Sequence, residues 1–145
     1  MDKKFMAKAL CISQQALPNC LPNPPVGCVI VRHGEIVAEG YTREPGGYHA
    51  EADALSLFTG DLSECDVYVT LEPCSFAGRT PSCAIALSNQ RPKRVVVGIL
   101  DTDPRNQGAG IQILKSAGID VETGILAEDV KAWLSPYLIS SETLC

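Results

Sequence analysis

The spacing of apolar residues changes along the chain, and each change predicts a different element. Residues 2–17 carry apolar side chains at helical spacing, and the proline-rich residues 18–25 end that helix. Two apolar runs, residues 26–31 and 35–41, flank His33-Gly34, a dipeptide that can supply the positive φ angles of a tight turn. The pattern predicts a helix followed by two antiparallel strands.

From His49 onward, segments of helical spacing alternate with short apolar runs typical of buried strands. We expect helices at residues 50–58, 82–88, 110–117 and 127–138, and strands at residues 67–71, 94–99 and 119–122. Because such alternation needs crossover connections, the later strands should be mainly parallel, with helices on both faces. The sequence therefore predicts one α/β domain over residues 1–145, a three-layer α/β/α sandwich around a mixed sheet of about five strands.

Composition limits the classes of partner. The chain has 12 Lys and Arg residues against 17 Asp and Glu, a net charge of −5, which argues against a nucleic-acid partner because no basic surplus is available for a phosphate backbone. No apolar run approaches the roughly 20 residues that span a bilayer, and the first residues lack the features of a signal peptide. We therefore expect a cytoplasmic protein with no membrane partner. In such a protein an odd number of cysteines, here seven, favours thiols or metal ligands over a disulfide framework.

Three short segments combine residue types that bind metals: His49-Ala50-Glu51, Glu72-Pro73-Cys74 and Cys83. His49 and Glu51 can reach one point only from the first turn of a helix, Cys74 follows a predicted strand, and Cys83 lies at the next helix start, which should favour its thiolate form. If these ends converge, one His and two Cys form a tetrahedral zinc site with the fourth position left for water. Glu51 is then a general acid/base beside that water, which is the chemistry of hydrolytic deamination. We expect one Zn²⁺ per chain.

Beyond the metal segments, the sequence is similar to a known family from about Phe5 to Ala127. The similarity rests on these segments together with residues 23–24, 26–27, 29–31, 54–55, 68–71 and Gly78-Arg79-Thr80-Pro81. They resemble the deaminase domain of the bifunctional riboflavin-biosynthesis deaminase/reductase, in the cytidine-deaminase-like superfamily. Eight residues separate Cys74 from Cys83, where the wider superfamily usually has two, and this spacing points to the riboflavin-type branch.

The resemblance implies a cytidine-deaminase-like fold and removal of an amino group from a small molecule, a phosphoribosylated diaminopyrimidinone. It also implies zinc ligation by the His and two Cys, with Glu51 as the proton shuttle. The substrate contacts it implies are Asn23 to the base or sugar, Arg79 and Thr80 to the ribose phosphate, and Ser75 and Asp101 in the pocket loops. We further expect a homo-oligomer. We also expect a separate downstream reductase, because the chain ends at Cys145, before the reductase domain that usually follows.

Three positions in the expected pocket loops depart from the family pattern. Thr42 and Phe76 stand where the family commonly has histidine, and Asp103 stands where it has asparagine. We expect these changes to make the pocket less favourable to an anionic phosphoribosyl group. The alternative substrate is therefore another small nucleobase, nucleoside, nucleotide or antimetabolite-like heterocycle. A nucleic-acid deaminase is opposed by the net charge of −5, and an inactive binding module by the intact metal and acid/base residues.

Overall fold

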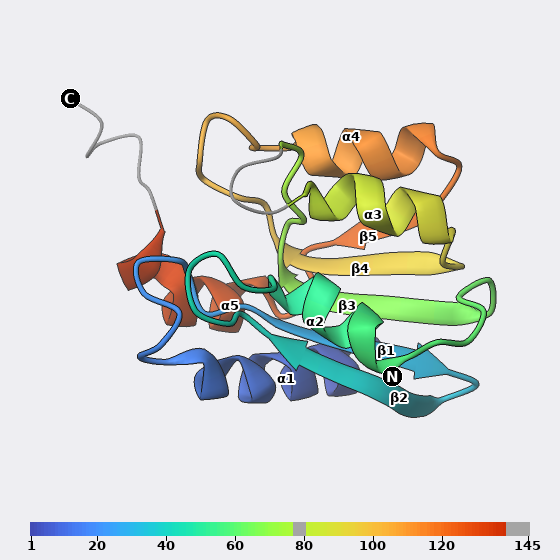
Figure 1. The fold of residues 1–145 in the computed structure, drawn as a ribbon, viewed down its shortest axis with the longest axis horizontal. Helices are drawn as coiled ribbons and strands as arrows, with labels where there is room; N and C mark the ends of the chain where they lie inside the picture. The colour runs from blue at the N-terminus through green and yellow to red at the C-terminus, as the bar shows by residue number, and fades with distance from the viewer. Residues whose placement is uncertain (77–80, 139–145) are drawn as a thin grey trace.

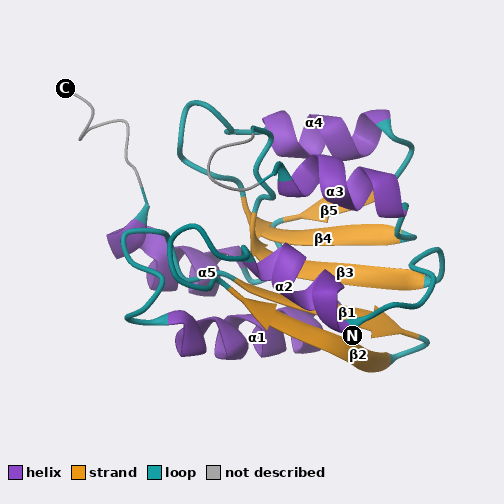
Figure 2. Cartoon of the chain, viewed as in Figure 1, coloured by secondary structure: helices purple, strands orange, loops and turns teal. Residues whose placement is uncertain are grey.

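A mixed sheet of five strands, in the order β2-β1-β3-β4-β5, forms the middle of the molecule, with helices on both faces (Figure 1, Figure 2). The computed structural model describes residues 1–76 and 81–138. The elements along the chain are α1 (Asp2–Ser13), η1 (Gln14–Ala16), β1 (Gly27–Arg32), β2 (Glu35–Tyr41), α2 (Ala50–Leu57), β3 (Cys65–Leu71), α3 (Cys83–Gln90), β4 (Arg94–Ile99), α4 (Ala109–Ser116), β5 (Asp120–Thr123), α5 (Ala127–Leu134) and η2 (Ser135–Tyr137). The predicted fold class is confirmed.

Strands β1 and β2 form the antiparallel hairpin that the sequence predicts. The turn places His33 at a φ of 51° and Gly34 at 79°, the left-handed conformations that a tight two-residue turn needs. The pairing shifts register between Ile30 and Val31, a bulge in the ladder. Residues of β1 are buried as far as Val31, because helices cover both faces of this strand.

The second half of the sheet carries the site. Strand β1 pairs antiparallel with β3, whereas β3, β4 and β5 are parallel to one another, as the alternation of elements predicts. Helices α2, α3 and α4 cover one face, while α1 and α5 cover the other (Figure 1). Because β3 and β4 are parallel, their carboxyl ends lie at the same edge of the sheet. The segments that follow Leu71 and Ile99 therefore emerge side by side, the usual position of a ligand site in α/β folds.

Helix ends are where the structure departs from the sequence pattern. The apolar spacing that predicts a helix to residue 138 overshoots: α5 ends at Leu134 and a 3₁₀ turn follows, because Pro136 has no N–H to continue the α-helical ladder. Helix α3 starts at Cys83 with Ser82 as its N-cap, whose hydroxyl accepts a hydrogen bond from the Ile85 N–H at 3.3 Å. Within residues 1–76 and 81–138, no helix has the length and apolar character needed to cross a membrane.

Candidate metal centre and active site

The predicted metal residues converge at the carboxyl end of β3. His49 is the N-cap of α2 and has an extended backbone, Cys74 lies three residues beyond β3, and Cys83 opens α3. The ligand atoms of these three side chains all lie within 4.8 Å of one another. Among the described residues, they are the group of His, Cys, Asp and Glu side chains that could hold a metal ion.

The separations between these atoms match a zinc site. Nδ1 of His49 lies 3.8 Å from Sγ of Cys74 and 3.5 Å from Sγ of Cys83. A tetrahedral ion with Zn–S bonds of about 2.3 Å and Zn–N bonds of about 2.0–2.1 Å places such nitrogen and sulfur atoms about 3.6 Å apart. The donor set and its two nitrogen–sulfur separations therefore fit a zinc ion.

The two thiols differ in their surroundings. Sγ of Cys74 accepts hydrogen bonds from the Cys83 thiol and from the Cys83 backbone N–H, the latter at 3.2 Å. These bonds, together with His49, lower the pKa of Cys74 to about 4, while the thiol bond to Cys74 and burial raise the pKa of Cys83. The N–H at the start of α3 thus stabilises the thiolate of Cys74 and not that of Cys83, contrary to our expectation. A bound divalent cation would favour the thiolate form of both.

Glu51 lies in the first turn of α2, two residues beyond His49. Its side chain is buried, with the residue 4% exposed, yet it lines the same cavity as His49 and Cys74. Burial, together with the negative charge of Cys74, raises the pKa of Glu51 to about 7. A carboxyl group in this state can both accept and donate a proton near neutral pH, which is what a proton shuttle requires.

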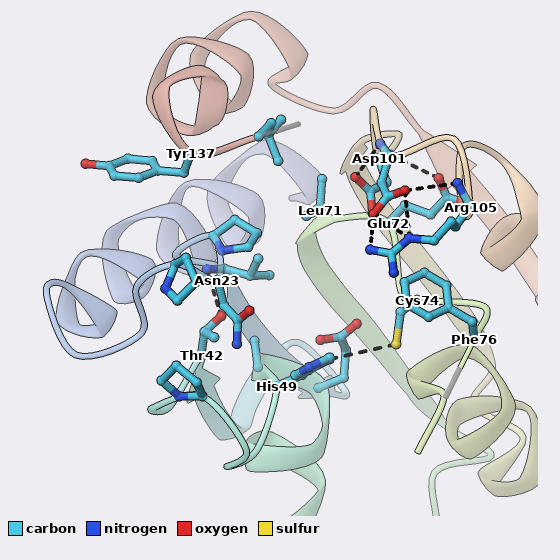
Figure 3. Close-up of a pocket in the computed structure, with 18 of the residues that line it drawn as sticks. Asn23, Thr42, His49, Leu71, Glu72, Cys74, Phe76, Asp101, Arg105 and Tyr137 are labelled. Carbon is cyan, nitrogen blue, oxygen red and sulfur yellow. Dashed lines mark hydrogen bonds and ion pairs between the residues drawn. The ribbon is translucent and has the colours of Figure 1, made fainter. Parts of the chain in front are cut away.

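A cavity of about 640 Å³ opens over the metal residues (Figure 3). Its walls come from segments far apart in the sequence: the proline-rich loop before β1, the loop after β2, the ends of β3 and β4, and the residues around η2. This volume is typical of a pocket for a small molecule. Asn23 and Thr42 lie on one side of it, and Asp101, Phe76 and Arg105 on the other (Figure 3).

The structure brings some of the predicted substrate contacts to this cavity. Asn23 and Asp101 line it. The Asp101 carboxylate accepts hydrogen bonds from the Asp103 N–H at 3.0 Å and from the Asn106 side-chain amide at 3.3 Å, and burial raises its pKa. Its orientation is therefore fixed before any substrate arrives.

Ser75, Arg79 and Thr80 are not placed in the same way. Ser75 is not among the described lining residues: its N–H donates to the Asn106 side chain at 3.1 Å, and its hydroxyl donates to the Arg105 carbonyl at 3.4 Å. These bonds hold the loop after β3 against the loop after β4. Arg79 and Thr80 lie outside the described residues, so their contacts with the substrate stay predictions.

The three departures from the family pattern fall into two groups. Thr42 is tied to the backbone of Val26, because its hydroxyl accepts from the Val26 N–H at 3.0 Å and its own N–H donates to the Val26 carbonyl at 3.1 Å. Phe76 and Asp103 share one partner, Arg105, whose guanidinium lies 4.5 Å from the centre of the Phe76 ring and makes an ion pair with Asp103. The sequence interpretation assigned no role to Arg105.

Glu72 is a second residue whose role the sequence interpretation missed. Its carboxylate is buried and accepts hydrogen bonds from the N–H groups of Asp101 at 3.0 Å, Gly108 at 2.9 Å and Ile111 at 3.2 Å. Glu72 thereby holds the loop after β4 and the start of α4 against the end of β3. The backbone of α4 comes equally close to the segment after β3: a Cβ on Gly110 would lie 2.0 Å from the Pro73 carbonyl oxygen, so only glycine fits there.

Comparison with known proteins defines the class to which this fold and site belong. The chain is a member of the family of cytidine and deoxycytidylate deaminases, whose zinc-binding region matches residues 1–99. Within that family it is similar to the riboflavin biosynthesis protein RibD of Actinobacillus pleuropneumoniae, with 45% identity over 131 residues, 90% of this chain and 35% of the relative. The resemblance inferred from the sequence is confirmed.

Solved structures give the same result. RibD of Acinetobacter baumannii superposes with a TM-score of 0.90 at 41% identity, covering 94% of this chain and 39% of that protein. A diaminohydroxyphosphoribosylaminopyrimidine deaminase/5-amino-6-(5-phosphoribosylamino)uracil reductase from Thermotoga maritima superposes with a TM-score of 0.87 at 36% identity, covering 94% and 40%. The chain thus spans somewhat more than a third of the length of these relatives.

Proposed function

We propose that the chain is a zinc-dependent hydrolytic deaminase of an amino-substituted pyrimidine, and that its substrate is the phosphoribosyl diaminopyrimidinone intermediate of riboflavin biosynthesis. The observation that carries the proposal is the His49, Cys74 and Cys83 donor set at zinc separations, with buried Glu51 in the same cavity. The similarity to RibD supports the choice of substrate.

In this proposal the three donors hold one zinc ion. When bound there, zinc supplies Lewis acidity that activates water toward the amine-bearing carbon of the ring. Two thiolates offset the charge of the ion, and the Cys83 N–H keeps Cys74 in its ligating form through the 3.2 Å hydrogen bond. His49 is positioned by the extended backbone at the start of α2.

Glu51 carries the proton. It accepts one proton from the attacking water and delivers it to the adjacent ring nitrogen. It then takes the remaining proton of the added hydroxyl and transfers it to the amino group, which leaves as ammonia while the carbonyl forms. Burial keeps bulk water from competing for this proton, and a pKa of about 7 lets the group reload after each transfer. Glu51 acts beside the metal and is not counted among its ligands.

The remaining walls of the cavity bind and orient the substrate. The Asn23 side-chain amide can both donate to and accept from the polar edge of a pyrimidine or its sugar, and Asp101 offers a carboxylate that Asn106 already orients. The apolar part of the lining, which includes Pro22, Pro24, Val26, Leu71 and Leu138, can pack against the ring. Arg79 and Thr80 complete the proposed set of substrate contacts, whereas Ser75 holds the pocket loops together through its bonds to Asn106 and Arg105.

The proposal extends to partners. The name of the Thermotoga maritima relative joins the deaminase to a 5-amino-6-(5-phosphoribosylamino)uracil reductase. We infer that the product of this chain is likewise consumed by a reductase, and that the chain functions as a homo-oligomer. Light scattering of the purified protein gives the subunit number directly.

A second candidate substrate is an unphosphorylated amino-heterocycle. The position of Phe76 at the cavity favours it, because a phenyl ring offers no hydrogen bond to a phosphate. Ammonia release from a panel of aminopyrimidines, aminopurines and their ribosyl phosphates tests both candidates on zinc-loaded protein. We expect the phosphoribosyl diaminopyrimidinone to be the best substrate, and release from none of the panel would overturn the deaminase assignment.

A further inference from the structure

The charges around the cavity are unevenly distributed. Its described lining residues include four carboxylates, namely Glu51, Glu72, Asp101 and Asp103. Arg105 is the only Lys or Arg among the lining residues of the described part of the chain. Apart from the proposed metal centre, Arg105 is therefore the permanent positive charge among the described lining residues that can pair with an anionic group of a ligand.

Arg105 is held from two directions. Its Nε lies 3.1 Å from each carboxylate oxygen of Asp103, and its Nη2 lies 2.6 Å from Oδ2 (Figure 3). Its backbone N–H also donates to Asp103 Oδ1 at 3.0 Å. The guanidinium carbon Cζ lies over the Phe76 ring, 4.5 Å from its centre, a cation–π contact. The Asp103 carboxylate and the Phe76 ring thus hold a long, otherwise flexible side chain in place.

One edge of the guanidinium stays available. Asp103 takes up Nε and one side of Nη2, whereas Nη1 has no hydrogen-bond partner among the described residues. The side chain of Asp103 is 10% exposed and that of Arg105 is 65% exposed, so the carboxylate is covered while the cation remains accessible. A planar guanidinium with a free edge matches two oxygens of a phosphate group.

We propose that Arg105 is a specificity-determining residue that binds the phosphate of a phosphorylated substrate, with Asp103 and Phe76 as positioning residues that hold its guanidinium at the cavity wall. The inference rests on the proposed deaminase function and adds the residue that recognises the phosphate of the substrate. It also gives a joint explanation for two departures from the family pattern: Phe76 and Asp103 replace a histidine and an asparagine, and both contact Arg105.

The test compares matched phosphorylated and dephosphorylated substrates. We expect Arg105→Gln to lower the ratio of kcat/KM for the phosphorylated over the dephosphorylated form by about ten- to a hundred-fold, the range for a charged, bidentate contact. The loss should appear in KM. Arg105→Lys keeps the charge but loses the planar, bidentate guanidinium, and should recover only part of the ratio.

Two further variants separate positioning from a general loss of charge. Asp103→Asn weakens the ion pair without removing the cation, and should lower the same ratio by less than Arg105→Gln. Lys115→Gln removes one positive charge from an exposed position on α4 and should leave the ratio at the parent value. The proposal would be overturned if Arg105→Gln kept the ratio of kcat/KM for the two substrate forms within twofold of the parent. It would also be overturned if Arg79→Gln, and not Arg105→Gln, lowered that ratio.

A binding measurement keeps this proposal separate from the deaminase assignment. If the parent releases ammonia from neither substrate form, the deaminase function fails, and calorimetry with ribose 5-phosphate and with ribose then tests Arg105. Tighter binding of ribose 5-phosphate than of ribose by the parent, lost in Arg105→Gln, supports the phosphate site. Equal binding of both sugars by the parent overturns it.

Discussion

The backbone N–H of Cys83 donates a hydrogen bond to Sγ of Cys74, 3.2 Å away. One proposed zinc ligand thus supports the other, through the first N–H of α3, one of the groups that has no partner within its own helix. The bond survives replacement of the Cys83 side chain, because it comes from the backbone. Loss of the Cys83 thiol should therefore remove a ligand without removing the support of Cys74.

Removal of either thiol should abolish tight zinc binding. We expect Cys74→Ser and Cys83→Ser each to lower zinc content from one ion per chain to well below half, because two protein ligands hold zinc far more weakly than three. Elemental analysis of dialysed protein gives the stoichiometry. Cys11→Ser, at an exposed cysteine on α1, is the matched control and should retain its zinc. Full zinc in Cys83→Ser would contradict the ligand assignment.

Glu51→Gln should separate catalysis from metal binding. The amide keeps the size of the side chain but cannot carry a proton, so we expect kcat to fall on the order of 10²- to 10⁴-fold with zinc content unchanged. Ammonia release and elemental analysis of the same preparation measure both quantities. Turnover within a few-fold of the parent would require another proton carrier.

The sheet was predictable because its strands are short apolar runs, separated by a tight turn or by segments of helical spacing. His33 and Gly34 adopt the positive φ angles that separate β1 from β2, and the predicted bounds of β2 and β4 match the structure. Helix ends were less predictable, since apolar spacing alone continued the last helix past Pro136. There the missing N–H of proline, a local effect, outweighs the periodicity.

In the site, the sequence predicted the residues whose chemical type indicates a role, but not the residues whose role depends on their neighbours in the fold. The metal donors are recognised by chemistry and spacing, whereas Arg105 acquires its place from Phe76, 29 residues earlier in the sequence, across the gap between two loops. Asp103 seemed to add a repulsive charge when considered alone, but the structure pairs it with Arg105. Such pairings depend on which strand ends are neighbours, and the order of strands does not follow from periodicity.

Asp2 links the start of α1 to the sheet, and its contribution to stability should depend on pH. Its carboxylate accepts hydrogen bonds from the Arg94 guanidinium at 2.6 and 3.1 Å and another from the Tyr68 hydroxyl. The hydrogen bonding to Arg94 is the main cause of the lowered pKa of Asp2. Because the pKa of Asp2 is lower in the folded state, its ionised carboxylate stabilises the fold at pH values above the pKa of the unfolded state, about 3.9. This stabilisation is lost as the pH falls through the pKa of the folded state. Asp2→Asn should therefore lower the free energy of unfolding by about 1–2 kcal/mol near neutral pH.

Urea denaturation of both proteins over a range of pH measures this difference. The gap between the Asp2→Asn variant and the parent should narrow as pH falls below about 4. Asp120→Asn, at an exposed position on β5, provides the control for loss of one carboxylate. A gap that stays constant with pH would show that Asp2 acts through something other than its charge.

Glu72→Gln should disturb both stability and substrate binding, because one buried carboxylate receives the N–H groups of Asp101, Gly108 and Ile111. An amide has a single oxygen, and its NH₂ group would face at least one of these donors, so an N–H loses its acceptor. We expect a loss of about 2–3 kcal/mol in the free energy of unfolding, measured in urea, against little change for Glu39→Gln at an exposed position on β2. Because the freed loop also carries Arg105, KM for a phosphorylated substrate should rise more than KM for its dephosphorylated form. A variant as stable as the parent, with the same two KM values, would mean that the loop after β4 keeps its position without Glu72.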